Sequence, residues 1–105
     1  MRTLALIGPG PAWTDGRPVF DQDPVVLGAH LDHMRGLFDD QTLLLGGQIV
    51  PGRSGLALFD TTTVAEADAR MAADPAVLAG LFTFGLLELM PYFDAFAGTR
   101  HGGAS

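Results

Sequence analysis

The 105-residue chain contains no cysteine and no lysine, and it has no long uninterrupted apolar run. The absence of cysteine excludes disulfides, thiolate nucleophiles and cysteine-ligated metal sites, and it fits a reducing compartment. The absence of lysine excludes an enzyme that forms a Schiff base through a side-chain amine. No stretch approaches the roughly 20 apolar residues of a membrane-spanning helix, so we expect no membrane partner.

Basic residues are also scarce. Six arginines are scattered along the chain against twelve acidic residues, which leaves a net charge of −6 and a pI of about 4.6. Because no basic stripe is present to neutralise phosphates, we expect no nucleic-acid partner. The first residues, MRTLALIGPGP, lack the long apolar region of a secretory signal peptide. We therefore predict a cytoplasmic protein.

The hydrophobic content of 48% and the length favour one folded domain with its own core. A short apolar run at 3–7, stopped by the turn sequence GPGP, predicts a buried strand. Further strands are predicted at 42–45 and 55–59, joined by a loose loop GGQIVPGRSG, and a last strand at 82–89. The run GPGP lacks the third glycine and the following helix of a dinucleotide-binding loop, so it predicts no cofactor.

Two helices are predicted between these strands. Asp23 caps the first, over residues 24–40, and four apolar side chains lie together on one side of it: Leu27, Leu31, Met34 and Phe38. The second begins at Thr63 with the capping-box sequence TVAE and ends at Asp74-Pro75.

The resulting order, β-α-β-β-α-β, predicts an α+β fold of the ferredoxin-like, split-βαβ type. Four antiparallel strands then carry both helices on one face. The other face needs a cover, so we expect a homodimer.

A histidine lies beside the apolar stripe of the first helix. On a helical wheel His30 is about 60° from Leu27, whereas His33 is about 120° away, near the solvent boundary. The residues alone leave two interpretations of His30 open, a hydrogen-bonded structural residue or a proton-transfer group. The two histidines lack a third metal ligand, since the remaining histidine, His101, is in the C-terminal tail. We predict no metal site.

Asp74 and Trp13 each have two interpretations on the residues alone. Asp74 either ends the second helix together with Pro75 or directs its carboxylate toward an imidazole on the first helix. Trp13, in the loop between Gly8 and Pro24, either lines a pocket or anchors that loop. Ser54 is not in a nucleophile elbow, because Leu56 stands where that motif requires glycine, and we interpret it as a loop residue.

The stretch HLDHMRGLFDDQTLLLGG, residues 30–47, resembles the YciI-like (YCII-related) family, as does TTVAEADARMAADPAVLAGLF further on. The resemblance covers residues 1–93 and leaves 94–105 as a flexible tail. It implies a dimeric α+β barrel with a pocket between sheet and loops, and an active site formed by His30 and Asp74. Trp13 and Met34 are then candidate pocket-lining residues. One departure is Gln41, which stands at a turn where the family usually has glycine.

The leading hypothesis is a small cofactor-free enzyme that uses the His30–Asp74 pair for acid–base chemistry of the lyase or isomerase type on a small metabolite. An aspartate bound to one imidazole nitrogen would fix the tautomer and leave the other nitrogen for proton transfer. The resemblance points the same way, since relatives are linked to removal of chloride from chlorinated aromatic compounds. A dimeric module that binds a small molecule without turnover is one alternative. A cofactor-independent monooxygenase is another.

Overall fold

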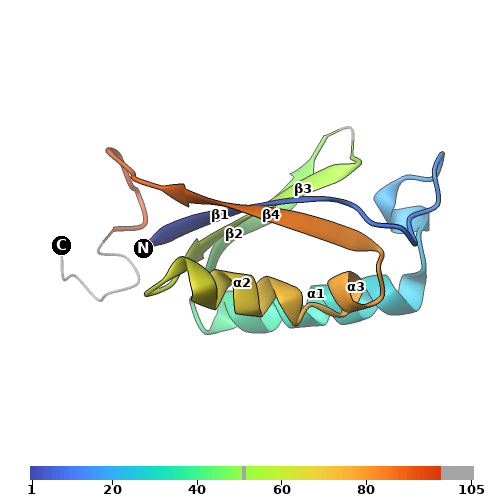
Figure 1. Ribbon diagram of the computed structural model, residues 1–105, viewed down its shortest axis with the longest axis horizontal. Coiled ribbons are helices and arrows are strands. Elements are labelled where there is room, and N and C mark those ends of the chain that lie inside the picture. Colours follow the sequence, from blue (N-terminus) through green and yellow to red (C-terminus); the bar gives the residue numbers. More distant parts are fainter. Residues whose placement is uncertain (51, 98–105) are drawn as a thin grey trace.

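The structure, a computed structural model, describes residues 1–50 and 52–97 of the chain. Its elements follow the order β1 (Arg2–Pro9), η1 (Val19–Asp21), α1 (Pro24–Asp39), β2 (Leu43–Ile49), β3 (Ser54–Asp60), α2 (Val64–Ala72), α3 (Pro75–Leu78) and β4 (Phe82–Leu89). The four strands form one sheet in the order β2-β3-β1-β4, and every neighbouring pair is antiparallel. All the α-helices lie against one face of this sheet (Figure 1). The predicted ferredoxin-like α+β fold is confirmed.

The core lies between the sheet and the helices. Alternate residues of β1, namely Thr3, Ala5 and Ile7, point toward the helices, and the neighbouring strand β3 adds Ala57 and Phe59 to the same side. Small side chains on α2 and α3 allow these short helices to approach the sheet closely. Within the described ranges, no helix has the length and apolar character needed to cross a membrane.

Three strands are longer than predicted, β3 by one residue at each end. The glycines at 46 and 47 were expected to end β2, but they pair with Ala57 and Leu56 of β3 and the strand continues to Ile49. The first strand continues to Pro9 because β4 pairs with Gly8 and Pro9. The other side of the strand is open there, since its pairing with β3 ends at Ile7. Proline is tolerated where one side of the ladder is already open. The first two residues of the predicted turn GPGP therefore belong to β1.

The helix termini follow the predicted capping residues. Asp23 accepts hydrogen bonds from the backbone N–H groups of Val25 and Val26 at the start of α1. Thr63 accepts from the Glu66 N–H, while the Glu66 carboxylate accepts from the N–H of Thr62. At the other end of α1, Gln41 has φ 67°, a left-handed conformation that favours glycine. Gln41 thus has a backbone conformation that glycine adopts more readily.

Arg2 holds the segment that follows β4. Its guanidinium lies 2.9 Å from Asp60 and 2.6 Å from Asp94. The hydrogen bond from Arg2 keeps the pKa of the Asp94 carboxyl below its ordinary value. Of the predicted tail, residues 94–97 form a turn closed by the Ala97 N–H on the Asp94 carbonyl, and residues 98–105 lie outside the described residues. The domain boundary at residue 93 stays a prediction.

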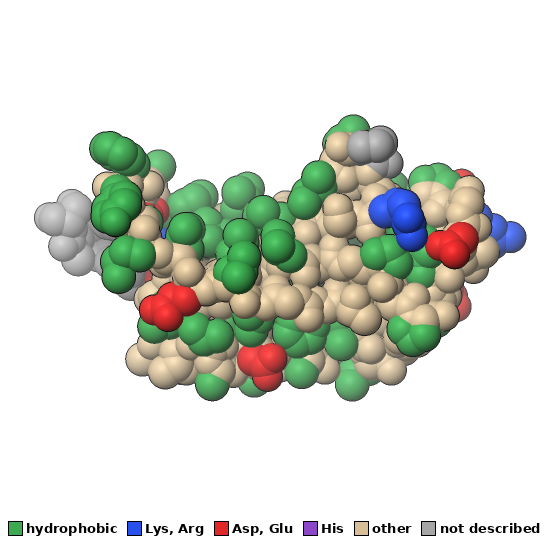
Figure 2. All heavy atoms as spheres, turned by 45° about the horizontal axis from the view of Figure 1, so that its top comes forward, with side chains coloured by type: hydrophobic (Ala, Val, Ile, Leu, Met, Phe, Trp, Pro, Cys, Tyr) green, Lys and Arg blue, Asp and Glu red, His purple; other side chains and the backbone are tan. Residues whose placement is uncertain are grey.

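The face of the sheet opposite the helices carries a patch of leucines. Register and alternation place seven of them there, and four are between 43% and 54% exposed. We call this set the open-face patch: Leu4, Leu6, Leu45, Leu56, Leu58, Leu87 and Leu89. Leu56 also borders the cavity described below. Figure 2 shows hydrophobic side chains gathered over the strands on this side of the molecule.

Backbone contacts hold the start of the Gly8–Pro24 loop against the turn before β4. The Gly10 N–H donates to the Leu81 carbonyl at 2.8 Å, and the Ala12 N–H donates to the Gly80 carbonyl at 2.9 Å. A Cβ atom at position 10 would overlap the carbonyl oxygen of Gly80. This close approach requires glycine and places Trp13 over the sheet.

Gly10→Ala should therefore lower the free energy of unfolding by about 1–3 kcal/mol, because the two backbone segments must separate. Urea denaturation measures the change. Gly28→Ala is the matched control, since this glycine is on α1 with open space around it. Alanine there should raise the free energy of unfolding by about 0.5–1 kcal/mol. Equal effects of the two substitutions would contradict the prediction.

Candidate functional site

His30 and Asp74 come together although 44 residues separate them in the sequence. His30 is on α1, and its Nδ1 lies 2.6 Å from Oδ2 of Asp74, at the junction of α2 and α3. The His30 side chain is 15% exposed and that of Asp74 is fully buried. The sequence left open whether this aspartate ends the second helix or meets an imidazole. The structure shows that it meets the imidazole and begins α3, whereas α2 ends at Ala72 with Ala73 as its C-terminal cap. The roles of the two residues in catalysis stay a prediction.

The second carboxylate oxygen of Asp74 caps α3. Oδ1 accepts a hydrogen bond from the Ala76 N–H at 3.0 Å, and Pro75 occupies the first helical position. A carboxylate taken out of water needs such partners, since an unpaired buried charge is strongly destabilising. The cap fixes the orientation of the carboxylate, and the carboxylate in turn orients the imidazole.

This arrangement selects one tautomer of His30. An ionised carboxylate accepts hydrogen bonds and cannot donate them, so Nδ1 carries the proton. Nε2 of the neutral ring then holds a lone pair, and it makes no hydrogen bond to another described residue. The imidazole also packs edge-on against Phe82, with ring centroids 5.0 Å apart. A histidine held in this way can accept a proton at Nε2 and return it.

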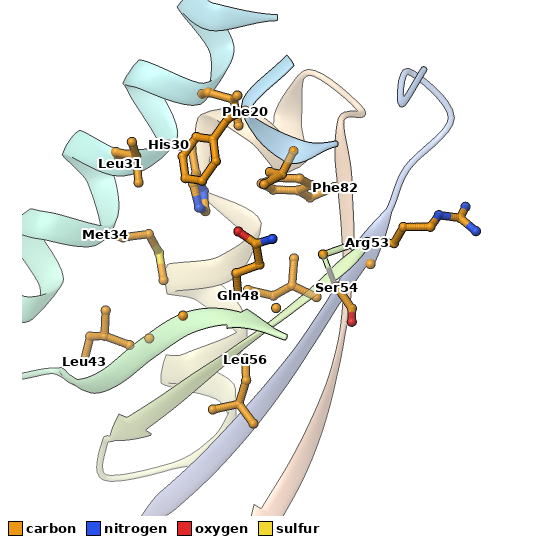
Figure 3. A pocket seen from close by; sticks show the side chains of 18 of the residues that line it. Phe20, His30, Leu31, Met34, Leu43, Gln48, Arg53, Ser54, Leu56 and Phe82 are labelled. Carbon is orange, nitrogen blue, oxygen red and sulfur yellow. The ribbon is translucent and has the colours of Figure 1, made fainter. Parts of the chain in front are cut away.

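His30 lines a cavity of about 450 Å³ between α1, the sheet and the Gly8–Pro24 loop. This volume is typical of sites for small molecules, which span about 300–1,000 Å³. Most of the lining is apolar (Figure 3). The aromatic and aliphatic side chains are those of Ile7, Trp13, Val19, Phe20, Leu27, Leu31, Met34, Phe38, Leu43, Leu56 and Phe82.

The apolar stripe of α1 was expected to form part of the core, and for two of its residues this is wrong. Leu27 is buried, but Leu31 is 54% exposed and Phe38 is 55% exposed. Both line the cavity. The stripe therefore faces the cavity there, opposite the glycines at 46, 47 and 55, instead of packed side chains. Leu37, on the neighbouring side of α1, is buried in their place.

Trp13 and Met34 both line this cavity. Trp13 is only 9% exposed and its ring lies 6.2 Å from that of Phe82, so it also anchors the loop to the body of the protein. Its Nε1 is buried with no hydrogen-bond partner among the described residues. Both interpretations of Trp13 therefore hold.

Sequence reasoning missed the contribution of the β2–β3 hairpin. Gln48, Arg53 and Ser54 line the cavity, although this stretch was interpreted as a loose loop. In Figure 3 the Gln48 side chain extends from β2 toward His30, whereas Arg53 extends away from the cavity. The signal available in the sequence was the density of glycines at 46, 47, 52 and 55, all of which line the cavity with backbone.

His33 is not part of this site. Its Nε2 donates to the backbone carbonyl of Arg70 at 2.8 Å, so it bridges α1 and α2. In the described part of the chain, no three histidine, aspartate or glutamate side chains are grouped in a way that could hold a metal ion. Neither ring is therefore placed in a set of metal ligands.

Comparison with known proteins shows similarity of fold. A scan of protein-family models and a search of curated proteins both find no match. Among solved structures, the chain is similar to 5-chloro-2-hydroxyhydroquinone dehydrochlorinase (TftG) from Burkholderia phenoliruptrix in complex with 2,5-dihydroxybenzoquinone. The two chains are 16% identical, the match covers 86% of this chain and 94% of that one, and the TM-score is 0.60. Protein Atu4242 from Agrobacterium tumefaciens also matches, with 16% identity, coverage of 88% and 96%, and a TM-score of 0.44. At this identity the likeness to the dehydrochlorinase shows a shared fold.

The tautomer of His30 can be tested directly. Long-range ¹H–¹⁵N NMR spectra should show the proton on Nδ1 of neutral His30 in the wild type. Asp74→Asn preserves the shape of the side chain, but its amide NH₂ can donate to Nδ1, so the proton should move to Nε2. His33 in the same spectra is the internal control and should not change. A proton on Nε2 of neutral His30 in the wild type would contradict the assignment.

Proposed function

We propose that the protein is a small enzyme in which His30 transfers protons, without a cofactor, in lyase- or isomerase-type chemistry on a small ring-bearing metabolite. The observation that carries this proposal is the imidazole bound to a buried carboxylate through Nδ1 at the wall of an apolar cavity. Nε2 would take a proton from the ligand and return it at another position, or give it to a departing group.

The cavity favours a cyclic and largely apolar ligand. Its walls bring aromatic and aliphatic groups around one imidazole, so a ring would bury apolar surface while an oxygen substituent reached His30. The Gln48 side chain extends toward the same imidazole (Figure 3). Its carboxamide makes no hydrogen bond to a side chain or backbone group of the described residues, so it is available to such an oxygen. The similarity in fold to a dehydrochlorinase that binds a dihydroxybenzoquinone supports a ligand of this size.

Proton transfer can be tested before the substrate is known. In D₂O, the wild-type protein should catalyse exchange of C–H protons for deuterium in a member of a panel of hydroxylated cyclic ketones and quinols, observed by ¹H NMR. His30→Ala should slow this exchange by about 10²-fold or more, because the general base is lost. His33→Ala should leave the rate within about twofold, since His33 is outside the cavity.

Exchange by His30→Ala at the wild-type rate would contradict the proposal. Saturable binding of a ring compound by the wild-type protein with no exchange and no turnover would instead support the alternative of a non-catalytic binding module.

We further propose that the protein is a homodimer joined through the open-face patch. The leucines of this patch lie on all four strands, and the helices cover only the opposite face. A second copy supplies a matching apolar surface, because a two-fold axis brings the same patch of each protomer together. Burial of such a patch contributes favourable free energy in proportion to its apolar area.

Light scattering of the wild type should therefore give twice the chain mass of 11.0 kDa. Leu87→Arg places a charge in the patch on the edge strand β4, beside Leu4, and should give a folded monomer by scattering and circular dichroism. Leu78→Arg is the control, since Leu78 is 75% exposed on α3 on the helical side. It should leave the dimer intact. A monomeric wild type would contradict the dimer.

A further inference from the structure

The charged side chains around the cavity are all of one sign. Apart from the titratable His30, only Arg35 and Arg53 contribute formal charge to its lining. All twelve acidic residues of the chain lie in the described part, and none of them lines the cavity. The whole chain carries a net charge of −6, so the formal charge of this lining is opposite in sign to that of the molecule.

The two arginines come from different walls. Arg35 is on α1, one turn beyond Leu31, and Arg53 is in the turn between β2 and β3. Arg35 is exposed and has no ion pair with another described residue. Both guanidinium groups are therefore near solvent, at the mouth and not at the imidazole.

Arg53 is held only weakly. Its guanidinium lies 3.4 Å from Asp15, and the two side chains are 71% and 89% exposed. An exposed pair of this kind contributes little to stability, since water and salt screen it. Arg53 extends away from the cavity in Figure 3, and its long side chain can turn toward an anion at the mouth at small energetic cost.

The space between the arginines and the histidine fits a flat group. On the sheet side Gly46 and Gly55 present backbone without side chains, and a Cβ at Gly46 would lie 3.4 Å from Leu43. On the helix side Leu31, Met34 and Phe38 form an apolar row. A planar ring between these two surfaces would bury both of its faces, with one edge toward His30 and the other toward the mouth.

We infer that the ligand of this cavity is a planar ring compound that carries an anionic group, such as a carboxylate, bound at the mouth by Arg35 and Arg53. The inference rests on the proposed function, since it gives the substrate class of the same site. A neutral ring would gain the apolar contacts alone. An anionic ring gains the guanidinium groups as well, in a protein whose overall charge repels it.

Matched probes test the inference without turnover. Isothermal titration calorimetry compares hydroxylated benzoates and phenylacetates with their primary amides, which have the same ring and nearly the same size but no charge. The wild type should bind the acid about tenfold more tightly than the amide at low ionic strength, and added sodium chloride should reduce this preference. The variant Arg35→Gln/Arg53→Gln should bind acid and amide with equal affinity.

The control variant is Arg17→Gln/Arg70→Gln, which removes the same charge from two arginines outside this cavity and should keep the preference. An amide bound as tightly as its acid by the wild type would overturn the inference, as would a preference that survives in Arg35→Gln/Arg53→Gln. Neither result would touch the proposed function, which is judged by deuterium exchange and its dependence on His30.

Discussion

The buried carboxylate of Asp74 links helix α1, which carries His30, to helix α3. One oxygen caps α3 through the Ala76 N–H, and the other holds Nδ1 of His30 on α1. A buried charge is tolerated only where its partners are fixed, so both helices must keep their positions for the carboxylate to stay satisfied. The result is an imidazole whose orientation is set by the packing of two helices on a sheet.

The cavity exists because α1 has more apolar surface than the sheet covers. Leu27 and Leu37 pack into the core, while Leu31 and Phe38 remain half exposed beside the glycines of β2 and β3. Larger side chains at those glycine positions would fill the space under the helix. Exposed apolar side chains around a concave surface are typical of a binding site, because they lose contact with water when a ligand enters.

Much of the fold could be predicted from the sequence, since period and capping are local signals. The helix begun by Asp23-Pro24 and the capping box at Thr63 are formed as predicted, and β4 has the predicted bounds. The bounds of β1 and β2 were too short, because pairing across the sheet overrides the local preference of glycine and proline. The local preference of glycine and proline is visible in the sequence around them, whereas the strand that pairs with them is not.

The site was predictable only in part, for a related reason. A helical wheel places His30 at the edge of an apolar stripe. Its contact with Asp74, which is 44 residues away in the sequence, depends on how the helices pack against one another. The resemblance to a family supplied that pairing, and the geometry agrees with it. Gln48 and Arg53 carried no such signal, because the run GGQIVPGRSG resembles a loose loop until β3 fixes its register.

Strand β2 links the two apolar surfaces of the molecule. Beyond its irregularity between Leu43 and Leu45, alternate residues face opposite sides, so Gly46 and Gln48 border the cavity while Leu45 belongs to the open-face patch. The strand is at the edge of the sheet and pairs only with β3. An edge strand with two glycines is weakly held by its own ladder. Burial of Leu45 against a second copy would therefore also restrain the wall from which Gln48 reaches toward His30.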